Sequence, residues 1–278
     1  MKGTFLSLDP KAEIFEKLKS LNPKWWNLFK NDKELYIDIR KDNYINVYYL
    51  GASVAEIKFK IDFIAKTHQK YLGDIVPRGK TKNEKDKFEY DRIDLNVFDA
   101  KKLNEIKKQI ESHYSKRNSS EHPSEKSIQG KMITANSKYI DSEFQFNQDS
   151  EINNLRIDLI ELSNCRISFV ELKGISDSRL RNDVKRNSVL PEIIEQMEKY
   201  QLFINKYEKA ILNYYKTFLE IKMSLGLSTI NCSNLTLNKN PKLIIVDTYT
   251  KVTLGRTNRI KDIEKLLKDN KIDYEILK

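Results

Sequence analysis

The chain has 278 residues, of which 39% are hydrophobic and 10% aromatic, and this apolar content excludes a disordered protein. Its formal net charge of +10 favours a polyanionic partner, nucleic acid before a membrane surface, although a generally lysine-rich surface would give the same excess. No apolar run approaches the roughly 20 residues of a membrane span, so we expect no contact with a membrane interior.

The first part of the chain predicts a small α+β domain that begins with one or two short helices within 9–30. Three runs rich in β-branched and aromatic residues follow, separated by turn-forming residues, which indicates an antiparallel β-meander. These runs are 34–41, 43–51 and 53–61. A charged loop, a further strand and a helix are then expected at 77–87, within 88–98 and at 100–114.

The polar segment 115–126 contains no apolar residue, and we place a domain boundary there. Residues 1–118 then form the N-terminal α+β domain, with a role in recognition or regulation left open. Residues 119–278 follow the order helix, three strands, long helix, strand, helix and short strand. That order predicts an α/β (α+β) architecture with a central mixed β-sheet flanked by helices.

A β-hairpin is expected in the stretch RIDLIELSNCRISFVELKG, where two apolar runs flank a short polar turn. With Asn164-Cys165 at the turn, Asp158 lies opposite Glu171, and side-chain alternation places Lys173 on the same face. Opposed side chains have Cβ atoms about 5 Å apart, so two carboxylates there repel unless a cation or a shared proton compensates. Such a cluster is typical of a Mg²⁺ site for phosphate chemistry.

The acidic-x-lysine spacing by itself is a weak signal, because it recurs elsewhere in the chain. Examples are Asp9-Lys11, Glu56-Lys58, Glu105-Lys107 and Glu220-Lys222. Only Glu171 follows a continuous apolar run, ISFV, and only Glu171 has an aspartate opposite. A cross-strand salt bridge at the surface is the alternative interpretation.

A helix is expected just before the strands, with Ser124 as its N-cap. It places Glu125 and Gln129 on one face, at i, i+4 spacing. Glu121 and Glu143 compete with Glu125 as the acidic residue that this helix region would bring to the cluster.

A long, apolar-periodic helix is expected to begin near Pro191, a residue suited to a first helical turn. Gln196 and Tyr200 share one face of this helix. A hydrogen-bonding pair beside the core would show the same spacing, and that interpretation stays open.

The order of these residues resembles the PD-(D/E)XK nuclease superfamily, particularly members with a RecB-like QxxxY helix. The matching positions are Glu125, Asp158, Glu171-Leu172-Lys173 and Gln196-x-x-x-Tyr200. The resemblance covers roughly 124–247 and implies a restriction-endonuclease-like core.

The resemblance also implies a role for each position. Asp158 and Glu171 would be metal ligands for Mg²⁺, or for Mn²⁺ as a substitute, with the Leu172 carbonyl as a third ligand and Glu125 as the helix carboxylate of the metal site. Lys173 would be the catalytic lysine. Gln196 and Tyr200 would position the substrate or the site.

The loop between the hairpin and the long helix is basic. Its cationic residues are Arg179, Arg181, Lys185 and Arg186. Lysine and arginine contacts to phosphates give sequence-independent affinity for nucleic acid, so these residues are candidates for binding DNA. An ordinary solvated loop is the alternative.

Aromatic residues are frequent in the N-terminal part, and some of them could stack on nucleic-acid bases. Trp25, Trp26, Tyr44, Tyr48 and Tyr49 are the candidates. Because a small domain needs aromatic side chains for its core, we expect most of these five to be buried.

The two cysteines, Cys165 and Cys232, form no CxxC motif and predict no disulfide framework, which indicates a reducing compartment. The three histidines lack zinc-ligand spacing, and the N-terminus lacks the apolar region of a secretory leader. We therefore expect a soluble, cytoplasmic protein.

These observations together predict a Mg²⁺-dependent nuclease that acts on DNA, of the kind found in restriction, defence or mobile-element systems. One alternative is a catalytically inactive nucleic-acid-binding protein with the same fold, and another is an RNA-directed nuclease. A membrane-surface or protein-interaction module is less attractive, since no amphipathic basic helix is present. A homodimer is left open.

Overall fold

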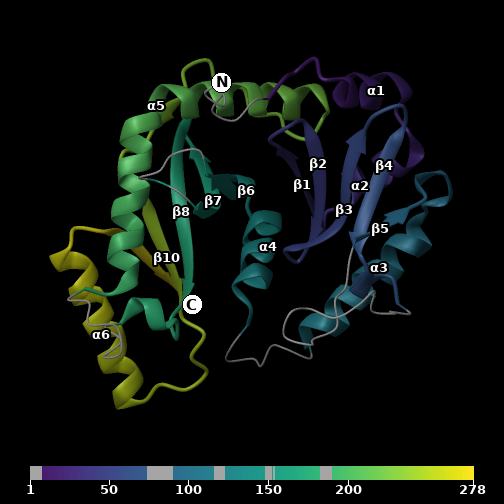
Figure 1. Cartoon of the computed structure of the whole chain (residues 1–278). Helices are drawn as coiled ribbons and strands as arrows, with labels where there is room; N and C mark the ends of the chain where they lie inside the picture. Colours follow the sequence, from purple (N-terminus) through teal and green to yellow (C-terminus); the bar gives the residue numbers. More distant parts are fainter. Residues whose placement is uncertain (1–7, 74–89, 116–122, 148–151, 153, 182–189) are drawn as a thin grey trace.

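The structure is a computed structural model that describes residues 8–73, 90–115, 123–147, 152, 154–181 and 190–278. Within these ranges the chain is a mixed α/β protein with two β-sheets and six α-helices (Figure 1). None of the helices in the described ranges combines the length and the apolarity that a membrane span requires. The charged loop expected at 77–87 lies outside these ranges.

The first sheet is antiparallel and has the strand order β1-β2-β3-β4-β5. Its strands are β1 (Leu35–Arg40), β2 (Tyr44–Tyr49), β3 (Ala52–Phe59), β4 (Phe63–His68) and β5 (Tyr90–Ile93). The meander of three strands and the strand within 88–98 are thus confirmed. Strand β4 was not expected, because its sequence FIAKTH carries a lysine and a histidine among few apolar residues.

Three helices cover one face of this sheet: α1 (Glu13–Leu21), α2 (Lys24–Asn31) and α3 (Ala100–Ser115). Side chains alternate along β2, so Tyr49 is buried toward these helices while Tyr44 and Tyr48 lie half-buried on the other face. Trp25 and Trp26 are also buried. The preference for core is therefore confirmed for three of the five aromatic residues.

The second sheet is mixed and has the strand order β11-β10-β8-β7-β6, with β9 beside β8. Its strands are β6 (Tyr139–Phe146), β7 (Leu155–Ser163), β8 (Arg166–Gly174), β9 (Thr236–Leu237), β10 (Lys242–Val246) and β11 (Asp273–Leu277). Strands β6, β7 and β8 pair antiparallel, whereas β10 pairs parallel with β8 and with β11. The remaining helices are α4 (Glu125–Ala135), α5 (Glu192–Ser224) and α6 (Leu254–Asp269). A parallel neighbour needs a crossover, and α5 and α6 supply the two crossovers.

The hairpin between β7 and β8 has the register that its sequence predicts. Asn164 and Cys165 form its turn with φ angles of 50° and 56°, and the two positive values match a two-residue turn that follows the strand twist. Ser163 consequently pairs with Arg166, and the pairing continues toward the other end of both strands.

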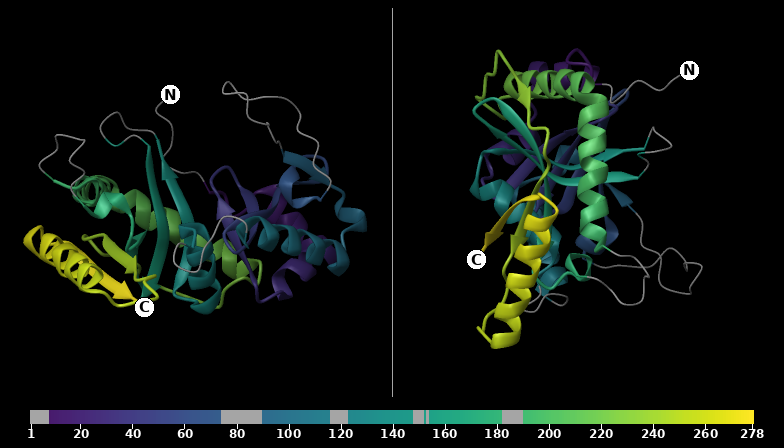
Figure 2. Two further views of the ribbon diagram at one scale, coloured as in Figure 1. Left: turned by 90° about the horizontal axis from the view of Figure 1, so that it is seen from below. Right: turned by 90° about the vertical axis from the view of Figure 1, so that its left-hand side faces the viewer.

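Helix α5 is bent, and its two halves lie against different sheets. The bend falls at Tyr207, whose φ of −116° and ψ of 17° are not helical. The first half runs along the second sheet, and the second half crosses toward the first sheet (Figure 2). The long helix expected near Pro191 is confirmed, with Pro191 as its N-cap.

The two sheets share one continuous core and a buried cluster of charges. Arg40 of β1 lies 3.0 Å from Asp38 and 3.3 Å from Asp141 of β6, and Lys222 of α5 lies 3.6 Å from Asp38. Asp38 and Asp141 are each only 2% exposed. The boundary that we placed at 118/119 falls within 116–122, outside the described residues, but the described parts on either side are packed together.

A disulfide joins Cys165 to Cys232, which corrects the expectation of unpaired cysteines. The turn between β7 and β8 brings Cys165 next to the segment that follows α5, and the two Cα atoms lie 5.5 Å apart. No local pattern indicates this pair, because 67 residues separate the cysteines and no short spacing motif links them.

Helix α4 contacts the first sheet through two glycines, which supports a stability prediction. A Cβ atom at Gly130 would lie 2.5 Å from the Gly51 nitrogen and 2.6 Å from the Leu50 carbonyl carbon, both backbone atoms. Gly130→Ala should therefore lower the free energy of unfolding by roughly 1–3 kcal/mol through overpacking, as measured by urea denaturation.

The matched control is Gly255→Ala in α6, where no atom lies within 4 Å of the added Cβ. Alanine there should raise the free energy of unfolding by up to about 1 kcal/mol, because glycine is the poorer helix former. Equal effects of the two substitutions would contradict the close contact between α4 and the turn that joins β2 to β3.

Candidate functional site

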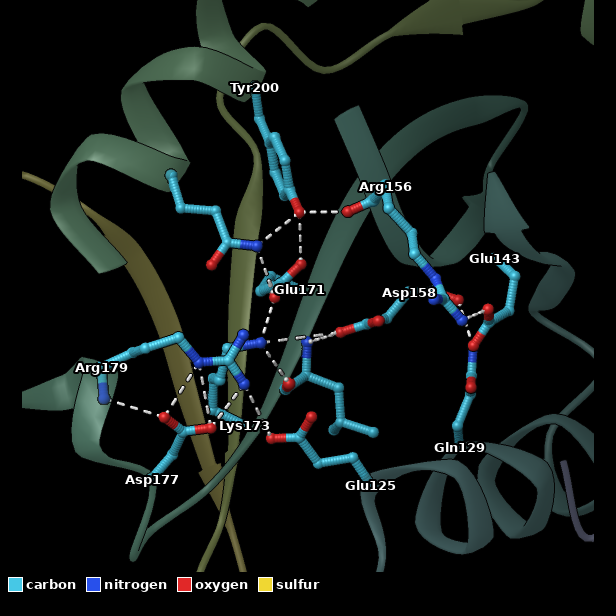
Figure 3. Close-up of polar contacts among 12 residues, drawn as sticks. Glu125, Gln129, Glu143, Arg156, Asp158, Glu171, Lys173, Asp177, Arg179 and Tyr200 are labelled. Carbon is cyan, nitrogen blue, oxygen red and sulfur yellow. Dashed lines mark hydrogen bonds and ion pairs between the residues drawn. The ribbon is translucent and has the colours of Figure 1, made fainter. Parts of the chain in front are cut away.

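Asp158, Glu171 and Lys173 meet where β7 and β8 lie side by side (Figure 3). The Lys173 ammonium forms an ion pair with Glu171 and lies 3.0 Å from the Leu172 carbonyl oxygen and 4.0 Å from Asp158 Oδ2. The Leu172 N–H donates a hydrogen bond of 2.9 Å to Asp158 Oδ2. The hairpin register thus brings the three charged groups together on one face, as expected.

The cluster is buried, so the alternative of a surface salt bridge is wrong. Glu171 is 2% exposed and Lys173 is 1% exposed, because the apolar run ISFV carries β8 into the interior. Burial, followed by the charge of Asp158, raises the pKa of Glu171 to about 7, while Lys173 acts in the opposite direction. A second cation at this place would favour the ionised form of Glu171 further.

Helix α5 presents two hydrogen-bonding side chains to the same carboxylate. Gln196 Nε2 donates to Glu171 Oε1 over 2.7 Å, and the Tyr200 hydroxyl donates to Glu171 Oε2 over 2.6 Å. The Tyr200 hydroxyl also contacts the Arg156 carbonyl. Burial and the charge of Glu171 raise the pKa of Tyr200, which keeps the phenol neutral. The expectation that Gln196 and Tyr200 face the cluster is confirmed.

Helix α4 reaches the site through its first two turns. Ser124 caps the helix as expected, since its Oγ accepts a 3.2 Å hydrogen bond from the Ser127 N–H. Gln129 Nε2 donates to the Asp158 carbonyl over 2.5 Å and thereby fixes the backbone of β7.

Of the two acidic candidates that the structure describes, Glu125 and Glu143, Glu125 is the one near the cluster. Burial raises the pKa of Glu125, and the charge of Lys173 opposes this shift. Glu143 forms an ion pair with Arg156 instead. Glu121 lies outside the described residues.

In the basic loop, Arg179 contacts carboxylates of the protein, although we expected it to be available for DNA. Arg179 donates to both carboxylate oxygens of Asp177, at 3.0 Å and 2.6 Å, and lies 3.5 Å from Glu125. Burial opposes ionisation of Asp177, but the hydrogen bonds from Arg179 prevail and lower its pKa to about 2. Arg179 therefore holds Glu125 by charge attraction. Because two carboxylates already contact its guanidinium, Arg179 differs from the phosphate-binding residue that we expected. Sequence reasoning missed Asp177, for which the D-S-R spacing was the only signal.

Of the other three cations of the loop, the structure describes one. Arg181 is exposed, as a phosphate contact requires. Lys185 and Arg186 lie outside the described residues.

The donor atoms of the cluster fit Mg²⁺. Two carboxylates and the Leu172 carbonyl surround the Lys173 ammonium, and Mg²⁺ prefers such hard oxygen ligands, using one or two carboxylates and completing its shell with water. Among the described residues, no three His, Cys, Asp or Glu side chains form a group that could hold a metal ion by themselves. Any metal would therefore depend on the carbonyl and on water as well.

No protein-family model matches this sequence, and neither curated proteins nor solved structures give a match. The mixed α/β class is accordingly established by the chain's own structure, and the function has to be argued from the site.

Proposed function

We propose that the chain is a divalent-metal-dependent nuclease of the PD-(D/E)XK type that hydrolyses phosphodiester bonds in DNA. One observation carries the proposal: a buried lysine ammonium, near the ends of β7 and β8 that lie away from their turn, is placed among the oxygens of Glu171, Leu172 and Asp158. Two carboxylates and a carbonyl oxygen beside a lysine suit phosphate chemistry with a divalent metal, because Mg²⁺ uses one or two carboxylates and completes its shell with water.

Each group has a physical role in this proposal. Asp158, Glu171 and the Leu172 carbonyl would hold Mg²⁺, or Mn²⁺ in its place. When bound, the metal lowers the pKa of a water molecule and stabilises charge on phosphorus. Lys173 orients the attacking water and offsets negative charge on the phosphate. Gln196 and Tyr200 hold Glu171 in place through its two oxygens.

The arrangement of elements supports a restriction-endonuclease-like core. Helix α4 precedes the antiparallel strands β6, β7 and β8, and α5 then crosses over to β10, which pairs parallel with β8. This is the order that the resemblance implies. The proposed core places the acidic residues on β7 and β8, next to the parallel strand pair.

The direct test is incubation with plasmid, linear and single-stranded DNA and with RNA, each with Mg²⁺, Mn²⁺ or EDTA. We expect cleavage of DNA with either metal and no cleavage with EDTA, because both carboxylates need a cation to act. Cleavage of RNA alone would favour the RNA-directed alternative. Failure to cut any nucleic acid with either metal would contradict the proposal.

One observation favours the second candidate, an inactive nucleic-acid-binding protein. The Lys173 ammonium already occupies the space between Glu171 and Asp158, so it satisfies the two carboxylates without a metal. Isothermal titration of the protein with Mg²⁺ separates the two candidates. Binding that is lost in Glu171→Gln supports the nuclease, and no detectable binding supports the inactive form. A homodimer and a cytoplasmic role in defence remain proposals that these experiments do not require.

A further inference from the structure

A groove of about 440 Å³ is lined by residues of the first sheet and by the start of α4. Strands β2 to β5 contribute Tyr48, Ser53, His68 and Tyr90 to its lining. Helix α4 contributes Lys126. The groove is therefore formed by both halves of the chain, and the helix that forms part of its wall also carries Glu125 and Gln129 of the candidate site.

A second hollow of about 220 Å³ continues the groove along β2 and β6. Both hollows are lined by Asn46, Tyr48 and Glu143, and the second one adds Lys41 and Tyr44. Together they form an elongated track along the first sheet, which α3 also lines through His113 and Tyr114.

The track adjoins the Asp158 cluster. Glu143, which lines both hollows, forms an ion pair with Arg156, and Arg156 precedes Asp158 by two residues on β7 (Figure 3). Lys126 lies close enough to Asp158 and Arg156 for both charges to act on its ammonium. A nucleic-acid strand bound in the groove would thus lie next to the carboxylates of the site.

The lining offers accessible aromatic rings. Tyr90, on the edge strand β5, is 52% exposed, and its ring meets that of His68 edge-on at 5.3 Å between centroids. Aromatic rings on an open sheet stack with nucleic-acid bases of any sequence, but only with unpaired bases, because the faces of paired bases are covered by their neighbours in the duplex.

The charge of the track suits phosphates. Glu143 forms an ion pair with Arg156, and the lining carries three lysines, Lys41, Lys70 and Lys126, of which Lys41 and Lys126 are exposed. Aromatic rings together with cations along one groove are typical of sites that bind single-stranded nucleic acid.

We propose that this groove binds a single-stranded stretch of DNA and directs it to the Asp158 cluster. The inference rests on the proposed nuclease function and adds a substrate class to it, namely DNA with unpaired bases next to the cutting point. Tyr90 and His68 stack on bases, and Lys126 contacts the backbone.

The test is fluorescence anisotropy with labelled single-stranded DNA, duplex DNA and single-stranded RNA of the same sequence, in EDTA so that nothing is cut. Tyr90→Ala should weaken binding of single-stranded DNA by roughly 5- to 100-fold, the range for loss of one stacked base, while duplex binding changes little. Tyr90→Phe keeps the ring and should bind like the parent. Lys126→Gln should weaken single-strand binding and reduce its salt dependence, whereas Lys261→Gln on the distant helix α6 should not.

The outcomes separate this inference from the function on which it rests. Unchanged single-strand binding in Tyr90→Ala, or an equal loss for duplex and single strand, overturns the groove even if the protein cuts DNA. A ring-dependent preference for RNA overturns the assignment of DNA. A ring-dependent affinity for single-stranded DNA without any metal-dependent cleavage leaves the groove supported and removes the nuclease proposal.

Discussion

Replacing Lys173 with alanine should reduce metal-dependent cleavage by at least about 100- to 1000-fold, the usual cost of losing one charge-stabilising group in an active site. The ammonium lies 3.0 Å from the Leu172 carbonyl oxygen and 4.0 Å from Asp158. It also forms an ion pair with Glu171, and no other described cation lies as close to that carboxylate. Affinity for nucleic acid should change little, because it would be distributed over many phosphate contacts. Cleavage rates with Mg²⁺ and binding constants in EDTA measure the two effects separately.

The control for this variant is Lys11→Ala. Lys11 has the same spacing to Asp9 as Lys173 has to Glu171, but it is exposed, so its loss should leave cleavage unchanged. Circular dichroism of Lys173→Ala must match that of the parent, because the substitution leaves two carboxylates near each other without their cation. A correctly folded Lys173→Ala protein that cuts as fast as the parent would end the catalytic interpretation of the hairpin.

Arg40→Met should lower the free energy of unfolding by about 3–5 kcal/mol, the range for removing one partner of a buried ion pair. The guanidinium lies between Asp38 and Asp141, and it also bonds the Tyr48 hydroxyl at 2.7 Å. Methionine has a similar length but no charge, so two buried carboxylates lose their nearest cation. Urea denaturation followed by tryptophan fluorescence measures the change, since Trp25 and Trp26 lie in the core of the first sheet.

Lys239→Ala is the control for the buried cluster. Lys239 forms an ion pair with Glu208, and both side chains are close to half exposed, at 47% and 40%. Exposed pairs contribute about 0–1 kcal/mol, so this variant should unfold almost like the parent. If Arg40→Met costs no more than Lys239→Ala, the charges between the sheets do not hold the two halves together.

The hairpin was the most predictable part of the molecule. Its turn residues set the register, and alternation along β8 then determined that Glu171 and Lys173 share a face. The spacing of Gln196 and Tyr200 likewise placed both on one face of α5, and that face lies against Glu171. These inferences depended on turn position, strand alternation and helix spacing, which can be read from neighbouring residues in the sequence.

Contacts between distant segments were not predictable in the same way. Arg179 looked like a free cation in a basic loop, yet Asp177 and Glu125 engage it, because the fold brings α4 beside that loop. Arg40 and Lys222 lie in the buried cluster with Asp38, and no local sequence pattern indicates that contact. Each of these pairs is determined by how the two sheets pack, and no spacing along the chain encodes that packing.

The disulfide encloses most of the proposed catalytic residues in one covalent ring. Glu171, Lys173, Gln196 and Tyr200 all lie between Cys165 and Cys232, in a loop whose ends are 67 residues apart. Closing a loop of that length reduces the conformational entropy of the unfolded chain and adds roughly 4 kcal/mol to stability in the chain-entropy model. Reduction of the disulfide would then remove this contribution to stability, while the chemistry of the carboxylates and the lysine would not depend on it.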